Sequence, residues 1–243
     1  MDLSFGIRHV TESRFGMIGQ PMVQLTSKGR VKAIVPDPIQ PERKFSLEED
    51  LLLPDDAPCI FSVSKGSLYS FQKIIDTGFP AKYFAFSFFQ SRASATRGWR
   101  IGYEDVPLGT YDVKGAERTF SNHYADIVSE LSPRIKKSRH AVVLVTLGSS
   151  HGYAAYLFIR MLKDMGIPFS VVAQAPIRTV CGKKRCECFE ISLERIRMEA
   201  PVVDVLYHDE LVDYSVWGRV TEAMRIADNA LAEIALKRLA ESS

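Results

Sequence analysis

The stretch Ala141-Val142-Val143-Leu144-Val145-Thr146-Leu147-Gly148-Ser149-Ser150-His151-Gly152-Tyr153 decides the fold of this chain. Its first five residues are apolar, which is typical of a strand buried on both faces of a parallel sheet. A turn of small residues follows, and Tyr153–Met165 has the apolar spacing of an amphipathic helix. A strand, a Gly/Ser turn and a helix N-terminus together bind phosphate, because free backbone N–H groups and the positive end of the helix dipole face the anion. The stretch therefore predicts an α/β fold with a phosphate-binding turn at Gly148–Gly152.

The same alternation of strands and helices runs along most of the chain. Further strands are predicted at Cys59–Val63, Tyr83–Phe89, Phe169–Ala173 and Val202–Leu206. Further helices are predicted at Leu68–Thr77, Arg118–Leu131 (closed by Pro133), Glu190–Glu199 and Trp217–Leu239. Alternating β and α elements favour a mostly parallel sheet with helices on both faces. The predicted fold class is α/β, a three-layer, Rossmann-like arrangement.

Residues 1–56 differ in pattern from the rest of the chain. Met22–Thr26 and Arg30–Val35 flank a Ser-Lys-Gly turn, which predicts a β-hairpin. Prolines that break regular structure follow at positions 36, 38 and 41. We expect an N-terminal extension over residues 1–56, either an arm that binds a partner or a strand pair that pads the sheet edge. A single α/β domain is expected over residues 57–243.

Composition excludes several classes of protein. The 243 residues carry a formal net charge of +2, which is too small to favour binding to nucleic acid or to an anionic membrane surface. No apolar run reaches the length of a membrane span, and the N-terminus lacks the pattern of a signal peptide. The unevenly spaced cysteines do not form a secreted disulfide framework. We therefore expect a cytoplasmic protein without integral membrane association.

Six stretches follow the order and spacing of a known set of motifs. They are Val63–Tyr69, Leu147–Tyr153, Val171–Pro176, Cys181–Arg185, His208–Leu211 and Thr221–Leu231. In that order they resemble a first glycine-rich loop, a GGGTGTG phosphate signature, the strand before a conserved proline, an EGRKR-like loop, an NDxL motif and an EAFxxADxxL helix. These motifs belong to the GTP-binding domain of the FtsZ/tubulin family, and the resemblance covers Pro58 to Leu239.

The resemblance implies a site for GTP or GDP, with Mg²⁺, at the carboxyl ends of the parallel strands. Phosphates would lie against the two loops, the ribose near Arg185, and the base between Met224 and Asp228. The predicted ligand-binding residues are Gly66, Ser67, Gly148, Ser149, Ser150, His151, Gly152, Arg185, His208, Met224 and Asp228.

The chain departs from the family's pattern within these same motifs. The first loop keeps one glycine, Gly66, and the phosphate signature keeps Gly148 and Gly152, with Ser150 at the position of its threonine. Glycines in such loops let the backbone approach phosphate without a Cβ in the way. Their loss leaves two interpretations open: a protein that binds guanine nucleotide weakly, or an interaction or assembly module that binds none.

Four further substitutions affect individual contacts of the family. Phe88-Phe89-Gln90 replaces an Asn-Thr-Asp segment, Cys181 replaces a ribose-contacting glutamate, His208 replaces an asparagine, and Met224 replaces the aromatic residue that stacks on guanine.

Asp228 carries the most specific part of the resemblance. It matches the aspartate that reads the N1–H and exocyclic amine of guanine, and a buried carboxylate that accepts two such bonds selects strongly for that base. Its neighbours Arg225 and Asn229 also fit a second interpretation, in which Asp228 lies on a solvated helix face.

No residue is assigned a catalytic role. The sequence ends at Ser243, and it contains neither the family's water-activating acidic segment nor its second domain. The resemblance therefore implies at most a weak GTPase, and more readily a non-catalytic pseudo-GTPase of cytoskeletal or cell-division type. Such a protein would form a homo-oligomer or join an FtsZ-like partner.

Cys181, Cys186 and Cys188 suggest a third interpretation. They lie within eight residues beside three basic residues, which favour the reactive thiolate form. A structural zinc ion normally has four ligands, so a fourth would have to come from elsewhere, for example from Cys59 or His208. Zinc is the less favoured ligand; the alternatives are a redox-responsive segment and a flexible basic loop with incidental cysteines.

Overall fold

The computed structural model describes residues 22–25, 31–34, 53–87, 99–102, 113–178, 181–211 and 220–242. The chain divides into two compact units, residues 1–44 with 93–95, and residues 45–92 with 96–243. In the first unit, β1 (Met22–Leu25) pairs antiparallel with β2 (Val31–Ile34), which confirms the predicted hairpin. These two strands form a sheet of their own.

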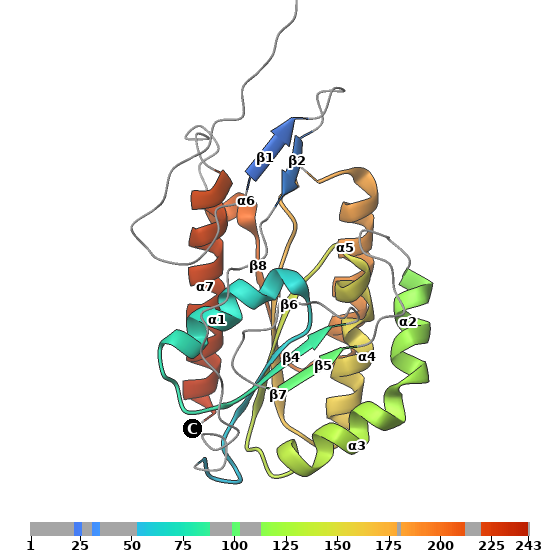
Figure 1. The fold of residues 1–243 in the computed structure, drawn as a ribbon, viewed down its shortest axis with the longest axis vertical. Coiled ribbons are helices and arrows are strands. Elements are labelled where there is room, and N and C mark those ends of the chain that lie inside the picture. Colours follow the sequence, from blue (N-terminus) through green and yellow to red (C-terminus); the bar gives the residue numbers. More distant parts are fainter. Residues whose placement is uncertain are drawn as a thin grey trace, which may run out of the picture. The chain divides into compact units, whose positions relative to one another are not determined.

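The second unit is built on a six-stranded sheet in the order β5-β4-β3-β6-β7-β8, and every neighbouring pair is parallel (Figure 1). Its strands are β3 (Cys59–Ser62), β4 (Lys82–Ser87), β5 (Trp99–Gly102), β6 (Ala141–Thr146), β7 (Phe169–Gln174) and β8 (Val203–Leu206). The predicted α/β class is therefore confirmed. The edge strand β5 was not predicted.

Helices cover both faces of this sheet (Figure 1). One face carries α1 (Leu68–Asp76) and α7 (Val220–Glu241). The other carries α2 (Val113–Asn122), α3 (Tyr124–Ile135), α4 (Ser150–Asp164) and α5 (Lys183–Glu199). A 3-10 turn (Lys65–Ser67) leads into α1, and the short α6 (His208–Leu211) follows β8. None of the helices in the described ranges combines the length and the apolar character needed to cross a bilayer.

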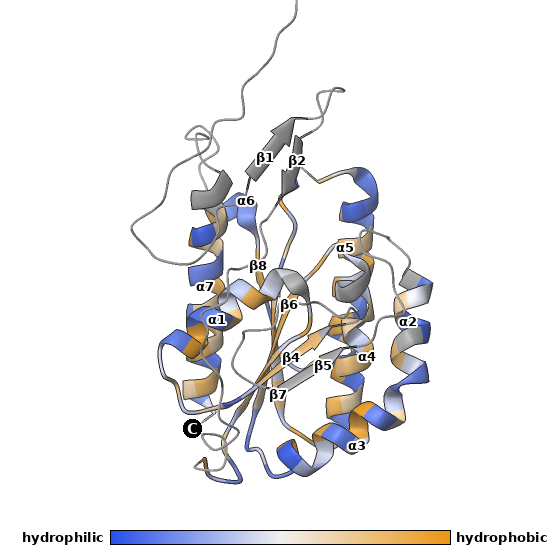
Figure 2. Cartoon of the chain, viewed as in Figure 1, coloured by the Kyte–Doolittle hydropathy of each residue, from blue (hydrophilic) through white to orange (hydrophobic). Residues whose placement is uncertain are grey.

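The core consists of two apolar layers, one on each side of the sheet. Successive strand residues point to opposite faces, so Phe61 and Val143 pack toward α2–α5, whereas Ile60 and Val142 pack toward α1 and α7. In Figure 2 the helices turn their apolar residues toward the sheet and their hydrophilic residues outward. Near-continuous apolar strands thus form because both faces of the sheet are covered.

One predicted helix is wrong in its bounds. A single helix was expected over Arg118–Leu131 with Pro133 closing it, but α2 ends at Asn122 and α3 begins at Tyr124. Pro133 lies inside the last turn of α3. Two residues follow it in the helix, and the last of these, Ile135, is fully buried. Burial of that side chain holds the turn in spite of the hydrogen bond that proline cannot make.

Two other helices begin earlier than predicted. Helix α4 starts at Ser150, so the last three residues of the predicted turn at Gly148–Gly152 belong to the first turn of a helix. Helix α5 starts at Lys183, seven residues before Glu190, so the expected basic loop is helical as well. Parts of other predictions lie outside the described residues, namely the segment Phe88–Gln90 and the start of the last helix at Trp217.

Candidate functional site

The first loop, which follows β3, is held together by its own hydroxyl groups. The Oγ atoms of Ser62 and Ser64 lie 2.7 and 3.1 Å from Oγ of Ser67. Ser67 also donates to the carbonyl oxygen of Ser64 at 2.9 Å. All three side chains are buried. Ser67, a predicted phosphate contact, thus has its hydroxyl engaged within the loop.

The first loop is also joined to the neighbouring strands β6 and β7. The backbone N–H of Thr146 donates to Oγ of Ser64 at 2.9 Å, and the Thr146 hydroxyl donates to Oε1 of Gln174 at 2.9 Å. A Cβ on Gly66 would lie only 2.6 Å from Oγ1 of Thr146. The single glycine of this loop is therefore required by packing against β6. Sequence reasoning missed Thr146 and Gln174, although each is the polar last residue of an apolar strand.

Both glycines of the second loop have a packing role. Gly148 has a φ of +81°, and a Cβ there would lie 3.0 Å from Cγ of Arg185 and 3.3 Å from Cγ of Pro176. A Cβ on Gly152 would lie 2.6 Å from the carbonyl oxygen of Thr146. These glycines let α4 start close to β6 and let α5 lie against the loop.

The N-terminus of α4 faces the carboxyl edge of the sheet. Ser149 is its N-cap and accepts a hydrogen bond from the backbone N–H of Gly152 at 3.2 Å. The N–H of Tyr153 donates to the carbonyl oxygen of Ser149 at 2.9 Å. Helix geometry leaves the N–H groups of Ser150 and His151 without an intrahelical acceptor. Together with the helix dipole, these amides suit an anion; the side chains of these two residues lie outside the described part.

Arg185 and His208 each contribute a buried polar atom without a partner. Among the described residues, Nε of Arg185 and Nδ1 of His208 are the buried side-chain nitrogen or oxygen atoms that make no hydrogen bond. His208 is 5% exposed. Burial and the charge of Arg185 lower the pKa of His208, against an opposing effect of Asp209, so the imidazole is neutral at pH 7. The structure thus brings Arg185 close to both His208 and Gly148, and Arg185 and His208 both have unused hydrogen-bonding capacity.

Asp228 is buried between α7 and α1. It is 8% exposed, which excludes the solvated helix face, and its Oδ1 accepts a hydrogen bond from the Ser70 hydroxyl at 2.9 Å. Burial raises the pKa of Asp228 to about 6, although the Ser70 hydrogen bond and the charge of Lys73 act in the opposite direction. Met224, one turn earlier in α7, is half-buried. Sequence reasoning missed Ser70, which stands just after the first loop.

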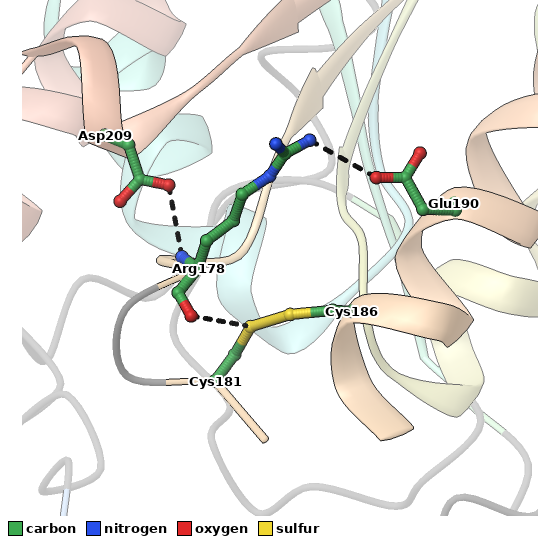
Figure 3. Close-up of a disulfide and its surroundings, with 5 residues drawn as sticks. All are labelled: Arg178, Cys181, Cys186, Glu190 and Asp209. Carbon is green, nitrogen blue, oxygen red and sulfur yellow. Dashed lines mark hydrogen bonds and ion pairs between the residues drawn. A yellow bond between two sulfur atoms is a disulfide. The ribbon is translucent and has the colours of Figure 1, made fainter. Parts of the chain in front are cut away.

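The cysteines do not gather at one point. Cys181 and Cys186 form a disulfide (Figure 3). Cys188 is a buried free thiol whose Sγ lies 3.6 Å from the carbonyl oxygen of Ser149. Cys59 lies at the amino end of β3, where its Sγ–H donates a hydrogen bond to Oγ of Ser138 at 2.9 Å. It is therefore at the opposite end of the sheet from the disulfide. In the ranges that the structure describes, no cluster of three or more His, Cys, Asp or Glu side chains is placed to hold a metal ion.

Two surface depressions lie away from this edge of the sheet. One, of about 440 Å³, lies over the outer face of α5, and the other, of about 480 Å³, lies where α4 and α5 end. Neither is lined by any of the eleven predicted ligand-binding residues. Between the two loops, Arg185 lies against Gly148, and the buried serine cluster occupies the first loop.

Comparisons with known proteins give structural matches alone. No protein-family model and no curated protein sequence matches the chain. CetZ2 from Haloferax volcanii, solved as a GTPγS-bound protofilament, matches with a TM-score of 0.64 at 17% identity, over 77% of this chain and 59% of that one. An empty FtsZ dimer from M. jannaschii matches with a TM-score of 0.66 at 16% identity, over 80% of this chain and 59% of that one.

A more distant relative shares the same architecture. TubZ from the Clostridium botulinum phage c-st matches with a TM-score of 0.60 at 9% identity, over 75% of this chain and 60% of that one. The chain thus spans about 59–60% of the length of these proteins. Identities this low define a shared fold, and the site residues have to be argued from their own geometry. The chain has a divergent FtsZ/tubulin-like fold.

Proposed function

We propose that this chain is a divergent guanine-nucleotide-binding protein whose site lies at the carboxyl edge of the six-stranded sheet. The observation that carries the proposal is the pair of buried, unpartnered nitrogens on Arg185 and His208. A buried polar group without a partner costs about 1–3 kcal/mol, so two of them at one place call for a ligand. Open α/β sheets bind ligands at this edge.

The neighbouring groups fit the parts of a nucleotide. The amides of Ser150 and His151 at the N-terminus of α4 suit a phosphate. Arg185 and His208 suit ribose or phosphate oxygens, since a guanidinium donates hydrogen bonds and a neutral imidazole can donate one from one of its nitrogens. Asp228, buried and held by Ser70, is a carboxylate of the kind that selects guanine through paired N–H bonds, and Met224 can pack on a base face through its thioether.

The same geometry argues that binding is weak. The serine cluster of the first loop uses its own hydroxyls, so Ser67 and Gly66 would supply little to a phosphate. The aliphatic stem and the backbone carbonyl oxygen of Arg185 lie against Gly148, which leaves little room for a phosphate at that glycine. The second candidate function, a pseudo-GTPase module that binds no nucleotide, is favoured by this filling of the first loop. In both cases we assign no catalytic residue, and any GTP hydrolysis would be slow.

A thermal-shift and calorimetry series with GTP, GDP and ATP, each with and without Mg²⁺, distinguishes the two functions. A ligand that binds the native state raises the melting temperature. We expect GTP and GDP to raise it more than ATP does. Replacing a charged hydrogen-bonding group usually weakens binding by about tenfold or more, so Arg185→Met, which keeps the aliphatic stem, should bind GDP at least about tenfold more weakly.

Arg238→Met is the matched control for this series. Arg238 bonds to Asp204 at 2.6 and 2.7 Å, away from the site, so this variant should keep the GDP affinity of the wild type. No shift with any guanine nucleotide at millimolar concentration would remove the first candidate and leave the second.

We also propose that the chain self-associates or joins an FtsZ-like partner. Two of the proteins that share its fold were solved as a protofilament and as a dimer. Light scattering of the purified chain with and without GTP, and then with an added FtsZ-like protein, tests this. A monomer under all of these conditions would contradict it.

A further inference from the structure

The disulfide between Cys181 and Cys186 joins the residue before the N-cap of α5 to the first turn of that helix (Figure 3). Both cysteines are half-buried, so the pair lies near the surface and not within the core. The disulfide encloses Arg185, the residue that lies against Gly148. It is therefore placed to control one of the proposed ligand contacts.

The first turn of α5 is poorly stabilised apart from this bond. Its N-cap is Gly182, which has no side chain to accept a hydrogen bond, and no acidic residue lies in the first turn. Instead, Lys183, Lys184 and Arg185 place positive charge at the positive end of the helix dipole, which is unfavourable. Places where a local sequence rule is broken are often functional. Opening the disulfide removes the covalent constraint on this turn.

The segment just before the disulfide has further contacts of its own. The backbone N–H of Arg178 donates to Oδ2 of Asp209 at 3.1 Å, and its guanidinium donates to Oε1 of Glu190 at 3.2 Å (Figure 3). The same guanidinium lies over the ring of Tyr207. Sγ of Cys181 also lies 3.7 Å from the carbonyl oxygen of Arg178 (Figure 3). The contacts with Asp209 and Tyr207 do not involve the sulfur atoms or α5, so we expect them to hold Arg178 when the disulfide opens.

We propose that Cys181 and Cys186 are a reversible thiol–disulfide pair that sets the position of Arg185 on the Gly148 loop. The oxidant is a low-molecular-weight disulfide such as oxidised glutathione. A Cys186 thiolate attacks one of its sulfurs, forms a mixed disulfide and releases one thiolate. The Cys181 thiolate then attacks Sγ of Cys186 and releases the second. Two protein thiols lose two electrons, the external disulfide becomes two thiols, and two protons pass to them.

The other two cysteines lack the features of this pair. Burial raises the pKa of Cys59 to about 11, and burial also raises the pKa of Cys188. Both are therefore protonated and shielded thiols. Cys186 in its reduced form lies at a helix N-terminus among cations, which stabilises the nucleophilic thiolate. The chain thus carries one exchangeable pair and two inert thiols.

The first experiment measures the exchange itself and is independent of nucleotide. The full chain is equilibrated in mixtures of reduced and oxidised glutathione, quenched with acid and labelled with a maleimide-polyethylene glycol. We expect two thiols to become reactive together in one two-electron transition, and Cys59→Ser, at the far end of the sheet, to behave like the wild type. Sulfurs that stay oxidised in excess dithiothreitol, or thiols that stay free in excess oxidised glutathione, would refute the pair.

A single variant identifies the attacking thiol. In Cys181→Ser, Cys186 should form a mixed disulfide and gain the mass of one glutathione. In Cys186→Ser, the remaining Cys181 should gain it at least about tenfold more slowly, since the thiolate fraction sets the rate. Equal rates would show that the first turn of α5 does not activate Cys186.

The second experiment measures the effect on Arg185. Amide hydrogen exchange of the oxidised and reduced chain should differ in the first turn of α5 and at Gly148, with exchange about tenfold faster after reduction. This readout stands whether or not a nucleotide binds. The further consequence, GDP affinity about tenfold lower after reduction, rests on the proposed function. Cys181→Ser/Cys186→Ser should match the reduced chain in both redox buffers, and identical exchange in the two states would overturn the link to Arg185.

Discussion

The two ends of the parallel sheet differ in how completely their buried polar groups are hydrogen-bonded. At the amino end, Lys82 donates to the carbonyl oxygens of Asp55 and Arg134 at 2.6 and 3.0 Å, and Cys59 bonds to Ser138. At the carboxyl end, Nε of Arg185 and Nδ1 of His208 have no partner within the described part of the chain.

This difference affects the free energy of unfolding. Paired polar groups at the amino end contribute to the free energy of unfolding, whereas unpaired buried groups at the carboxyl end reduce it. Such a cost persists where a ligand uses the group. The contrast therefore points to the carboxyl end as the binding edge, as the geometry of open α/β sheets also does.

The largest expected loss of stability is that of Gly152→Ala, at the carboxyl end of the sheet. The added Cβ would lie 2.6 Å from the carbonyl oxygen of Thr146, so α4 has to shift away from β6. Overpacking of this kind costs about 3 kcal/mol, which lowers the melting temperature by roughly 6–12 °C in a chain of this size. Gly182→Ala is the control, because no atom lies within 4 Å of its added Cβ. Equal melting temperatures for the two variants would contradict the packing role of Gly152.

A somewhat smaller effect, of the opposite sign, is expected for Asp228→Asn. Because burial raises the pKa of Asp228 to about 6, the native state binds its proton more tightly than the unfolded state. Its contribution to stability is therefore fully present below about pH 4 and is lost as pH rises through about 6. Removing the charge should stabilise the ligand-free chain at pH 7 by on the order of 2–3 kcal/mol and abolish the preference for guanine.

Urea unfolding at pH 5 and pH 7 measures this effect. The wild type should lose more stability than Asp228→Asn between the two pH values. Asp204→Asn is the matched control, because Asp204 is hydrogen-bonded to Arg238. Loss of its charge weakens these hydrogen bonds, so this variant should be less stable than the wild type. The same pH slope for wild type and Asp228→Asn would show that the Asp228 charge is not penalised by burial.

The smallest expected changes in stability are those of Arg238→Met and Arg185→Met, which should differ in sign or size. Arg238→Met removes a partly exposed pair with Asp204 and should lower stability by about 0.5–1 kcal/mol. Arg185→Met removes an unpartnered nitrogen and should leave the stability of the ligand-free chain unchanged or raise it by up to about 1 kcal/mol. Chemical denaturation without nucleotide tests both, and equal losses would remove the contrast between the two ends of the sheet.

Apolar patterning made most of the architecture predictable. The strands at 59–62, 141–146 and 169–174 are runs of buried residues whose alternate side chains enter the two core layers. Helix starts were predicted less well, because α4 and α5 begin with polar and basic residues that carry no apolar periodicity. The edge strand β5 is four residues long and contains Arg100, so it has little of the pattern of a buried strand.

The residues of the candidate site remain a prediction, and several of their contacts could not be predicted. The order of motifs predicted Gly148, Arg185, His208 and Asp228 as site residues, and the structure brings Arg185 close to Gly148 and to His208. Two of their contacts join residues far apart in the sequence: the Ser70–Asp228 hydrogen bond and the approach of Arg185 to Gly148. The nearby disulfide between Cys181 and Cys186 depends on where α5 begins.

The sequence by itself determined the α/β class and the mostly parallel arrangement of the main strands, because strand burial and helix periodicity are local properties of the chain. Only the tertiary structure decided which polar groups are paired. Hydrogen bonding and burial depend on atoms that the fold brings together from distant segments, as in the hydrogen bond from Ser70 to Asp228. The lack of hydrogen-bond partners for the buried nitrogens of Arg185 and His208 was likewise visible only in the folded structure.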